Sequence, residues 1–266
     1  MKPPVFNPAW SEEVKRLYHH DMQEIWDPKI NIHIWNQYHN QLDLYLEIAG
    51  KAQPNKAKKI LDVGCAQGTL ALLLGELGHN VWAVDLRDEF LEYAKTRYTY
   101  GNVEFLQGNV LVLDMDERFD LIFANQIIEH LVYPNQLISR LGQMLAENGR
   151  LVITTPNWHY LMNRLPSYRE LGDPAQYEEM QFTADGDGHF FSYSAKELVE
   201  IFEQESFTQV DFRYFETPFI SGHMKMRYCH YFAPVRLLRF MDRAIVNAPV
   251  LGRLLAHQLM VTGARA

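Results

Sequence analysis

The sequence is poor in cysteine and contains no long apolar run. Cys65 and Cys229 are the only cysteines among 266 residues. They are too few for a disulfide framework, so we expect a reducing compartment. No stretch reaches the roughly 18 apolar residues of a membrane span, and the N-terminus lacks an apolar signal core. These absences predict a soluble, cytoplasmic protein.

Positive charge is also scarce. The chain has 25 Lys and Arg residues against 33 Asp and Glu residues, a formal net charge of −8. Contacts to phosphates supply most of the affinity of nucleic-acid-binding proteins, so this balance disfavours nucleic acid as a partner. With 47% hydrophobic and 22% charged residues, the composition is typical of a globular protein with a buried core.

Two helical patterns open the chain. The first covers residues 11–26, starts at the capping candidate Ser11 and stops before Pro28. The second covers residues 34–49, carries apolar residues on one side and ends at Gly50. We expect residues 1–52 to form an N-terminal helical cap and residues 53–266 to form the main domain.

From residue 59 onward, short apolar runs alternate with helical patterns. The runs are continuously hydrophobic, as in strands covered on both faces, and they lie at residues 60–63, 81–84, 103–106, 121–124 and 151–154. Strand–helix alternation with right-handed crossovers predicts an α/β fold with a doubly wound, mostly parallel sheet.

The pattern loosens after Pro156. Residues 156–192 show no clear periodicity, and a loop of this length inside a compact domain is usually functional or disordered. A capping-box helix at 194–204 and two strand-like segments at 207–215 and 257–262 follow. Between those two segments lies a second insertion, residues 216–255.

The segment with a chemical signature is the turn after the first strand. Gly64 and Gly68 enclose this turn, a helical pattern follows it, and Asp85 ends the second strand. Such a unit forms a nucleotide-type site at the carboxyl end of a sheet, where the acidic residue accepts hydrogen bonds from ribose hydroxyls. A dinucleotide site needs glycine where Ala66 stands, so that the backbone can approach the pyrophosphate. The turn therefore favours a nucleoside without phosphates and disfavours a nicotinamide oxidoreductase.

The same segment resembles the first motif of the class I S-adenosylmethionine-dependent methyltransferases. Four further segments resemble later motifs of this family in the same order: residues 84–86, 107–110, 119–131 and 145–157. The likeness as a whole covers about residues 58–215. The resemblance implies a Rossmann-like, seven-stranded sheet with an antiparallel last strand, N-terminal helices, a C-terminal helical insertion and S-adenosyl-L-methionine as cofactor.

The resemblance implies cofactor-binding roles for Asp62, Gly64, Cys65, Gly68, Asp85, Leu86, Asn109, Val110 and Asn125. The two glycines would let the chain turn closely around the methionine part, Asp62 would orient its ammonium group and Asp85 would bind the ribose. Two alternatives stay open, because Asp readily bonds nearby backbone: Asp62 could tie down the turn, and Asp85 could cap the next helix.

The remaining members of this set surround the adenine and the methionine part. Leu86 and Val110 are candidates to sandwich the adenine ring, and Asn109 stands where the family more often has Asp, with a side-chain carbonyl that can still accept from the adenine amino group. The Asn125 carbonyl would lie near the ammonium group. Cys65 would pack under the cofactor as an unreactive small residue.

Methyl transfer from a sulfonium is an in-line displacement that needs a positioned nucleophile and usually an acceptor for its proton. The candidates for catalysis are His189, His130 and Glu129. His189 is the preferred base because it lies beside carboxylates in the loop segment 185–189, although it could instead cap or pack against the following helix.

Residues 126–130 also invite a comparison with metal sites. Ubiquinone-pathway O-methyltransferases and small-RNA 3′-end methyltransferases carry Glu-x-x-Glu-His here, whereas this chain has Gln126 in the first position. A neutral amide weakens a site for a hard cation, so we predict no metal and expect His130 to pack beneath the cofactor.

The C-terminal insertion is basic. Residues 223–253 contain six Lys or Arg residues and one Asp, a local charge of +5 in a chain whose remainder is −13. A plausible amphipathic helix carries Arg236, Arg239 and Arg243; it could lie on an anionic membrane or close over a lipid-linked or anionic substrate. It could also be a lid or dimer helix with a solvated basic face. The oligomeric state stays open.

The sequence as a whole predicts transfer of a methyl group from S-adenosylmethionine to an oxygen or nitrogen of a small-molecule acceptor. A secondary metabolite, a sugar or a lipid-linked intermediate would fit. The alternatives are an RNA 3′-end methyltransferase and a catalytically inactive cofactor-binding partner protein.

Overall fold

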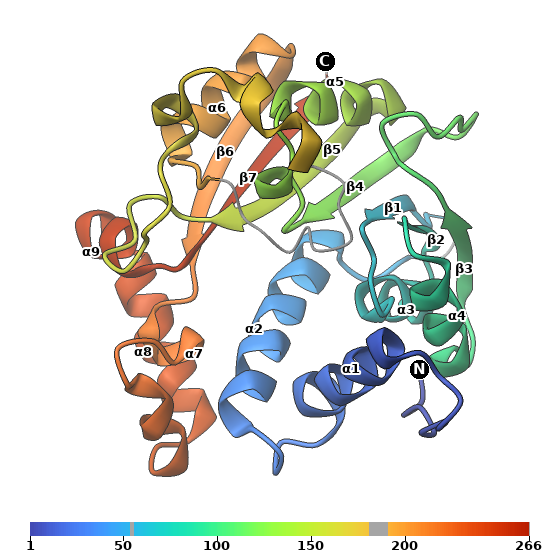
Figure 1. Ribbon diagram of the computed structural model, residues 1–266, viewed down its shortest axis with the longest axis vertical. Coiled ribbons are helices and arrows are strands. Elements are labelled where there is room, and N and C mark those ends of the chain that lie inside the picture. Colours follow the sequence, from blue (N-terminus) through green and yellow to red (C-terminus); the bar gives the residue numbers. More distant parts are fainter. Residues whose placement is uncertain (54–55, 181–190, 266) are drawn as a thin grey trace. The chain divides into compact units, whose positions relative to one another are not determined.

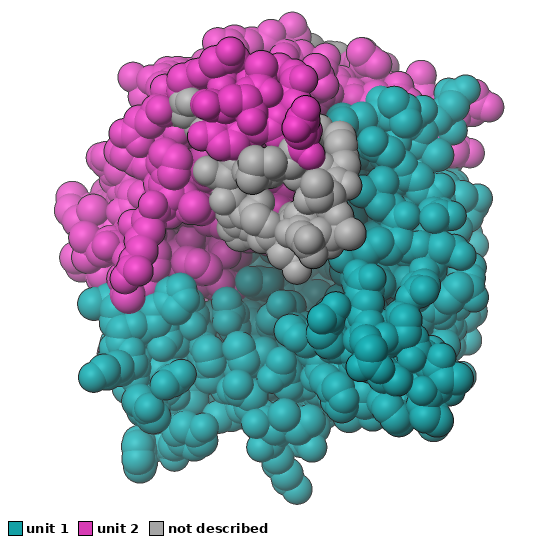
Figure 2. Space-filling view, in the orientation of Figure 1, with its two compact units in different colours: residues 1–114, 219–240 teal, residues 115–218, 241–266 magenta. Residues whose placement is uncertain are grey.

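The computed structural model describes residues 1–53, 56–180 and 191–265. The chain divides into two compact units, residues 1–114 with 219–240 and residues 115–218 with 241–266 (Figure 2). The predicted N-terminal cap lies within the first unit.

The first unit contains three parallel strands with their helices (Figure 1). In the register, Ile60 pairs with Val81, and Val81 pairs with Val103. The elements are α1 (Glu12–Asp21), the π-helical turn η1 (Met22–Trp26), α2 (Ile32–Ala49), β1 (Lys59–Val63), α3 (Thr69–Glu76), β2 (Asn80–Asp85), α4 (Asp88–Arg97), β3 (Asn102–Gln107) and η5 (Met226–Tyr231). Residues 60–63 of β1 are buried, and they are apolar apart from Asp62.

The first predicted helix is wrong in its last five residues. An α-helix ends at Asp21, and residues 22–26 form one π-helical turn, closed by the Asp27 N–H donating to the Met22 carbonyl at 2.8 Å. Trp26 Nε1 donates to Asp21 Oδ2 at 3.0 Å. Asp21, which precedes this wider turn, also contacts the distant residues Tyr93 and Arg97, and local periodicity does not show such contacts.

The second unit contains four strands. β4 and β5 are parallel, and β7 runs antiparallel to both β5 and β6. The elements are β4 (Phe119–Asn125), η2 (Ile128–His130), α5 (Pro134–Met144), β5 (Leu145–Pro156), η3 (Tyr168–Leu171), η4 (Pro174–Met180), α6 (Ala195–Gln204), β6 (Phe207–Phe215), α9 (Pro249–Leu255) and β7 (Gln258–Arg265). The short α7 (Pro218–Ser221) and α8 (Val235–Val246) each have residues in both units.

The strands form a seven-stranded sheet in the order β3-β2-β1-β4-β5-β7-β6. The predicted fold, a doubly wound, mostly parallel sheet with an antiparallel last strand, is confirmed. Within the described ranges, no helix combines the length and apolar character that a membrane crossing needs.

Candidate functional site

The turn between β1 and α3 is tight and positioned by the end of β2. The N–H groups of Gly64 and Cys65 both donate to the Val84 carbonyl, at 2.8 and 3.0 Å. Gly68 has φ +71°, and a Cβ there would lie 2.8 Å from Ala94 Cβ, so this position requires glycine. Ala66 also has a positive φ of 46°.

Asp62 and Asp85 are the two buried carboxyl groups at this turn. Asp62 accepts a hydrogen bond from the Ala71 backbone, and burial raises its pKa to about 7, with the neighbouring Asp85 adding to the effect. No cationic side chain in the described part of the chain pairs with Asp62. An ammonium group bound here would supply the missing positive charge, so the carboxyl fits the methionine part of S-adenosylmethionine.

Asp85 connects the turn to the start of α4. One of its oxygens accepts from the Ala66 N–H at 2.9 Å, and the other accepts from the Arg87 N–H at 3.0 Å. Asp62 thus contacts the backbone of α3, whereas Asp85 supports the turn through Ala66 and also bonds Arg87, the residue before α4. The start of α4 has no side-chain cap. A carboxylate oxygen has further lone pairs, so these bonds leave capacity for ligand hydroxyls.

The residues predicted for adenine differ in exposure. Leu86 is 54% exposed directly after Asp85, which offers an uncovered apolar surface to a ring, whereas Val110 is buried. The Asn109 side-chain oxygen accepts from the Leu111 N–H at 3.0 Å and so also shapes its own turn. Cys65 is buried, and burial raises the pKa of its thiol well above the usual value, which keeps it protonated and unreactive.

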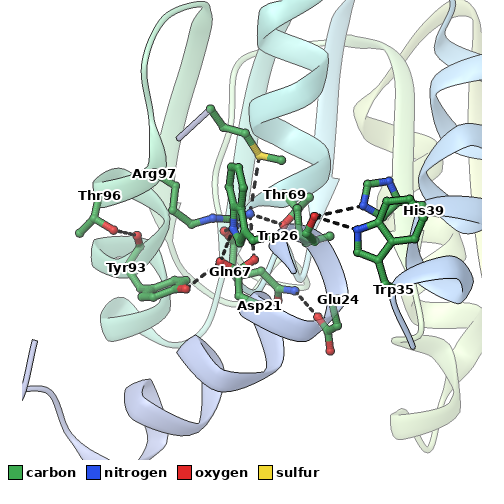
Figure 3. Close-up of polar contacts among 12 residues, drawn as sticks. Asp21, Glu24, Trp26, Trp35, His39, Gln67, Thr69, Tyr93, Thr96 and Arg97 are labelled. Carbon is green, nitrogen blue, oxygen red and sulfur yellow. Dashed lines mark hydrogen bonds and ion pairs between the residues drawn. The ribbon is translucent and has the colours of Figure 1, made fainter. Parts of the chain in front are cut away.

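A buried polar network supports the turn from the side of α4 and the N-terminal helices (Figure 3). The Arg97 guanidinium, which is fully buried, donates to the Gln67 carbonyl and, at 2.9 Å, to Thr69 Oγ1. It also forms an ion pair with Asp21 at 2.9 Å. Asp21 in turn accepts from the Tyr93 hydroxyl at 2.8 Å. Arg97 therefore holds the residues on both sides of Gly68.

Glu24 adds a second link between η1 and the turn. Its carboxylate accepts from Gln67 Nε2 at 2.9 Å and from the Tyr38 hydroxyl, and burial raises its pKa to about 7. Sequence reasoning missed Asp21, Glu24 and Arg97. Acidic residues in an opening helix and a basic residue in the last turn of another usually lie at the surface, so no sequence signal marked them.

The second unit contains Asn125, Glu129 and His130, which follow β4. Glu129 is fully buried, and this burial raises its pKa to about 8. Its Oε2 has no hydrogen-bond partner among the residues the structure describes. Asn125 Oδ1 accepts from Thr154 Oγ1 at 3.1 Å, which fixes the end of β4 against β5.

Gln126 stands beside this carboxyl in a strained backbone conformation. Its φ is +54°, and its side-chain amide contacts Gln258 Oε1 at 2.9 Å. With the amide turned over, its nitrogen also lies 3.2 Å from Glu129 Oε1. The residue that departs from the metal-site pattern is thus a polar neighbour of Glu129.

Two predicted features of catalysis remain predictions. His189 lies outside the described residues, and His130 is partly exposed. Among the residues that are described, no group of three or more His, Cys, Asp and Glu side chains is arranged to hold a metal ion.

Comparison with known proteins places this arrangement in a family. The model of the methyltransferase-domain family matches residues 18–211. The mitochondrial ubiquinone biosynthesis O-methyltransferase of Schizosaccharomyces pombe is 30% identical over 129 residues, which are 47% of this chain and 46% of that protein. The chain thus matches less than half the length of that relative.

Solved structures agree on the fold. A SAM-dependent methyltransferase from Archaeoglobus fulgidus superposes with a TM-score of 0.55 at 18% identity, over 85% of this chain and 92% of that one. Haemonchus contortus phosphoethanolamine N-methyltransferase 2, in complex with S-adenosyl-L-methionine, gives a TM-score of 0.56 at 16% identity, over 98% and 61%. The predicted enzyme class and cofactor, S-adenosyl-L-methionine, are confirmed at the level of the family. The chain belongs to the methyltransferase-domain family, among the class I S-adenosylmethionine-dependent methyltransferases.

Proposed function

We propose that the protein transfers a methyl group from S-adenosylmethionine to a hydroxyl oxygen of a small molecule in the cytoplasm. The observation that carries this proposal is the match of residues 18–211 to the methyltransferase-domain family. The tight turn that follows Asp62 and bonds Asp85, which resembles the first motif of that family, supports it. The turn fits a nucleoside that carries an amino-acid group, which supports S-adenosylmethionine as the cofactor.

Oxygen is favoured over nitrogen as the acceptor atom by the sequence relatives. Ubiquinone biosynthesis O-methyltransferases match at 30–35% identity, whereas the N-methyltransferase from Haemonchus contortus is only 16% identical and shares the fold. The net charge of −8 disfavours RNA as the acceptor.

Each side chain of the site has a chemical task in this proposal. When bound, S-adenosylmethionine supplies an electrophilic methyl group on a sulfonium. Asp62 binds the ammonium group and Asp85 the ribose. The proton of the acceptor hydroxyl would have to pass to a base of the protein. Glu129 suits that role, because a carboxyl with a pKa of about 8 exchanges protons near neutral pH.

The first experiment measures binding of S-adenosylmethionine and S-adenosylhomocysteine by calorimetry, with NAD as the control ligand and with and without a chelator. We expect both sulfur nucleosides to bind and NAD not to bind. A screen of small hydroxyl and amino compounds with methyl-labelled cofactor then identifies the acceptor atom. Absence of binding by both nucleosides would contradict the proposal.

The role of Glu129 is tested by Glu129→Gln. We expect turnover to fall by about 10²-fold or more, the usual contribution of a positioned base, with unchanged affinity for S-adenosylhomocysteine. Asp242→Asn is the matched control, because Asp242 is also a buried carboxyl of raised pKa. Full activity of Glu129→Gln would exclude it as the base and leave His189 and His130 as candidates.

A further inference from the structure

The segment of residues 224–240 carries a concentration of exposed apolar side chains. Phe232 is 89% exposed, Tyr231 70% and Phe240 69%. The full set comprises Met224, Tyr228, Tyr231, Phe232, Leu237 and Phe240. Single exposed apolar residues are ordinary on a protein surface, but six large ones within one short segment mark an interaction site. We call these six residues the aromatic surface.

The opposite side of this segment is fixed to α2. The Arg239 guanidinium donates to Asn36 Oδ1 at 2.8 Å and to Asp43 Oδ2 at 2.6 Å. The Asn36 amide nitrogen lies 3.1 Å from His230 Nε2, and Leu238 is buried. These contacts hold one side of the segment inward, so the aromatic surface faces outward in a defined orientation.

Residue spacing places its members on shared faces. Tyr228 and Tyr231 lie three apart in the 3₁₀ turn η5, where side chains at this spacing eclipse one another. Leu237 and Phe240 lie three apart in α8, and Arg236 lies four residues before Phe240. The apolar side chains of η5 and those of α8 therefore each project as a pair, and Arg236 accompanies the pair in α8.

The charge around the aromatic surface has one sign. Lys225, Arg227 and Arg236 are exposed, and the sequence from 217 to 241 contains no Asp or Glu. Cations near an anionic bilayer contribute about 1 kcal/mol each, and aromatic rings favour the interfacial zone. In a two-fold dimer formed through this segment, the positively charged patch would face its own copy, which disfavours a second copy of the chain as the occupant.

We propose that residues 224–240 dock the protein on the surface of an anionic lipid bilayer. The aromatic surface enters the interfacial zone, and Lys225, Arg227 and Arg236 pair with lipid phosphates. Docking itself is independent of the reaction, but its use in collecting an apolar acceptor from the bilayer rests on the proposed function.

Co-sedimentation of the full chain with vesicles tests this proposal. We expect binding to phosphatidylcholine vesicles that contain phosphatidylglycerol, weakened by salt, and little binding to pure phosphatidylcholine. Phe232→Ser with Phe240→Ser, and separately Lys225→Glu with Arg236→Glu, should each lower the affinity by about tenfold or more. Phe212→Ser and Lys95→Glu, at exposed positions elsewhere, are the matched controls and should bind like the wild type.

Several outcomes would overturn the docking proposal. These are absence of binding to anionic vesicles, equal binding to both lipid compositions, and unchanged binding by the surface variants. Sedimentation velocity without lipid tests a further contrary outcome. If the wild type were a dimer and the double variant Phe232→Ser with Phe240→Ser a monomer, the aromatic surface would serve self-association instead. Calorimetry with S-adenosylhomocysteine on the same variants separates the two proposals, because intact cofactor binding without vesicle binding contradicts the docking alone.

Discussion

At the scale of single residues, Asp62 makes a prediction about cofactor affinity. Its folded-state pKa is raised to about 7 by burial, and a bound ammonium group favours the ionised carboxylate, so binding must release a proton below that pH. We expect the affinity for S-adenosylhomocysteine to increase by up to about tenfold per pH unit as pH rises toward 7, and to level off above it. Calorimetry across this range, in buffers of different ionisation enthalpy, measures both effects.

Two variants separate Asp62 from other titrating groups. Asp62→Asn removes the titration and should give weak affinity that no longer follows pH in this way. Glu24→Gln removes another buried carboxyl with a pKa of about 7 near the turn, and should leave most of the dependence in place. If Glu24→Gln removed the pH dependence of the affinity instead, that dependence would arise from the contact between Glu24 and Gln67.

At the scale of elements, the contact between the N-terminal helices and α4 leads to a prediction about the free energy of unfolding. The ion pair between Asp21 and Arg97 has no exposure on either side. Asp21→Asn would leave the guanidinium charge buried without its partner, which typically costs about 3–5 kcal/mol of the free energy of unfolding. Urea unfolding measures this loss. Asp43→Asn, which breaks the exposed pair with Arg239, should cost no more than about 1 kcal/mol.

The same junction shows where sequence reasoning ended. The strand–turn–helix unit around Gly64 and Gly68 could be predicted, because buried parallel strands and tight turns restrict residue types locally. Asp21, Glu24 and Arg97 could not be predicted, because their burial depends on contacts between segments far apart in the chain. If Asp21→Asn proved as stable as Asp43→Asn, the network would be only an incidental support of the turn.

The C-terminal insertion also shows what could not be predicted from the sequence. The basic, amphipathic pattern of residues 223–253 was visible in the sequence, but the direction in which its side chains face was not. Arg239 turns toward Asp43, while Arg236 stays exposed beside the aromatic surface. A periodic pattern shows that a helix has two faces, whereas only tertiary contacts decide which face is covered.

At the scale of the whole molecule, buried carboxyls predict how stability follows pH. Glu24 and Asp62 have pKa values of about 7 and Glu129 one of about 8, all above their unfolded values near 4. The folded chain therefore binds more protons than the unfolded chain between those limits, so the free energy of unfolding falls as pH rises through them. From about pH 6.5 to 8 we expect a loss on the order of 2 kcal/mol in urea unfolding.

Between pH 6.5 and 8, the effect of the carboxyls on the free energy of unfolding is separated from that of groups with the opposite effect. His39, His159 and His230 have lowered pKa values, so their opposing effect lies below about pH 6.5. Among the groups of the described residues with a shifted pKa, the α-amino group opposes the carboxyls within the window. Glu129→Gln should reduce the slope by up to about 1.4 kcal/mol per pH unit, while Glu92→Gln, an exposed control, should not change it. A stability that rose between pH 6.5 and 8 would mean that these carboxyls are ionised in the folded protein, and Glu129 would then lose its suitability as a base of raised pKa.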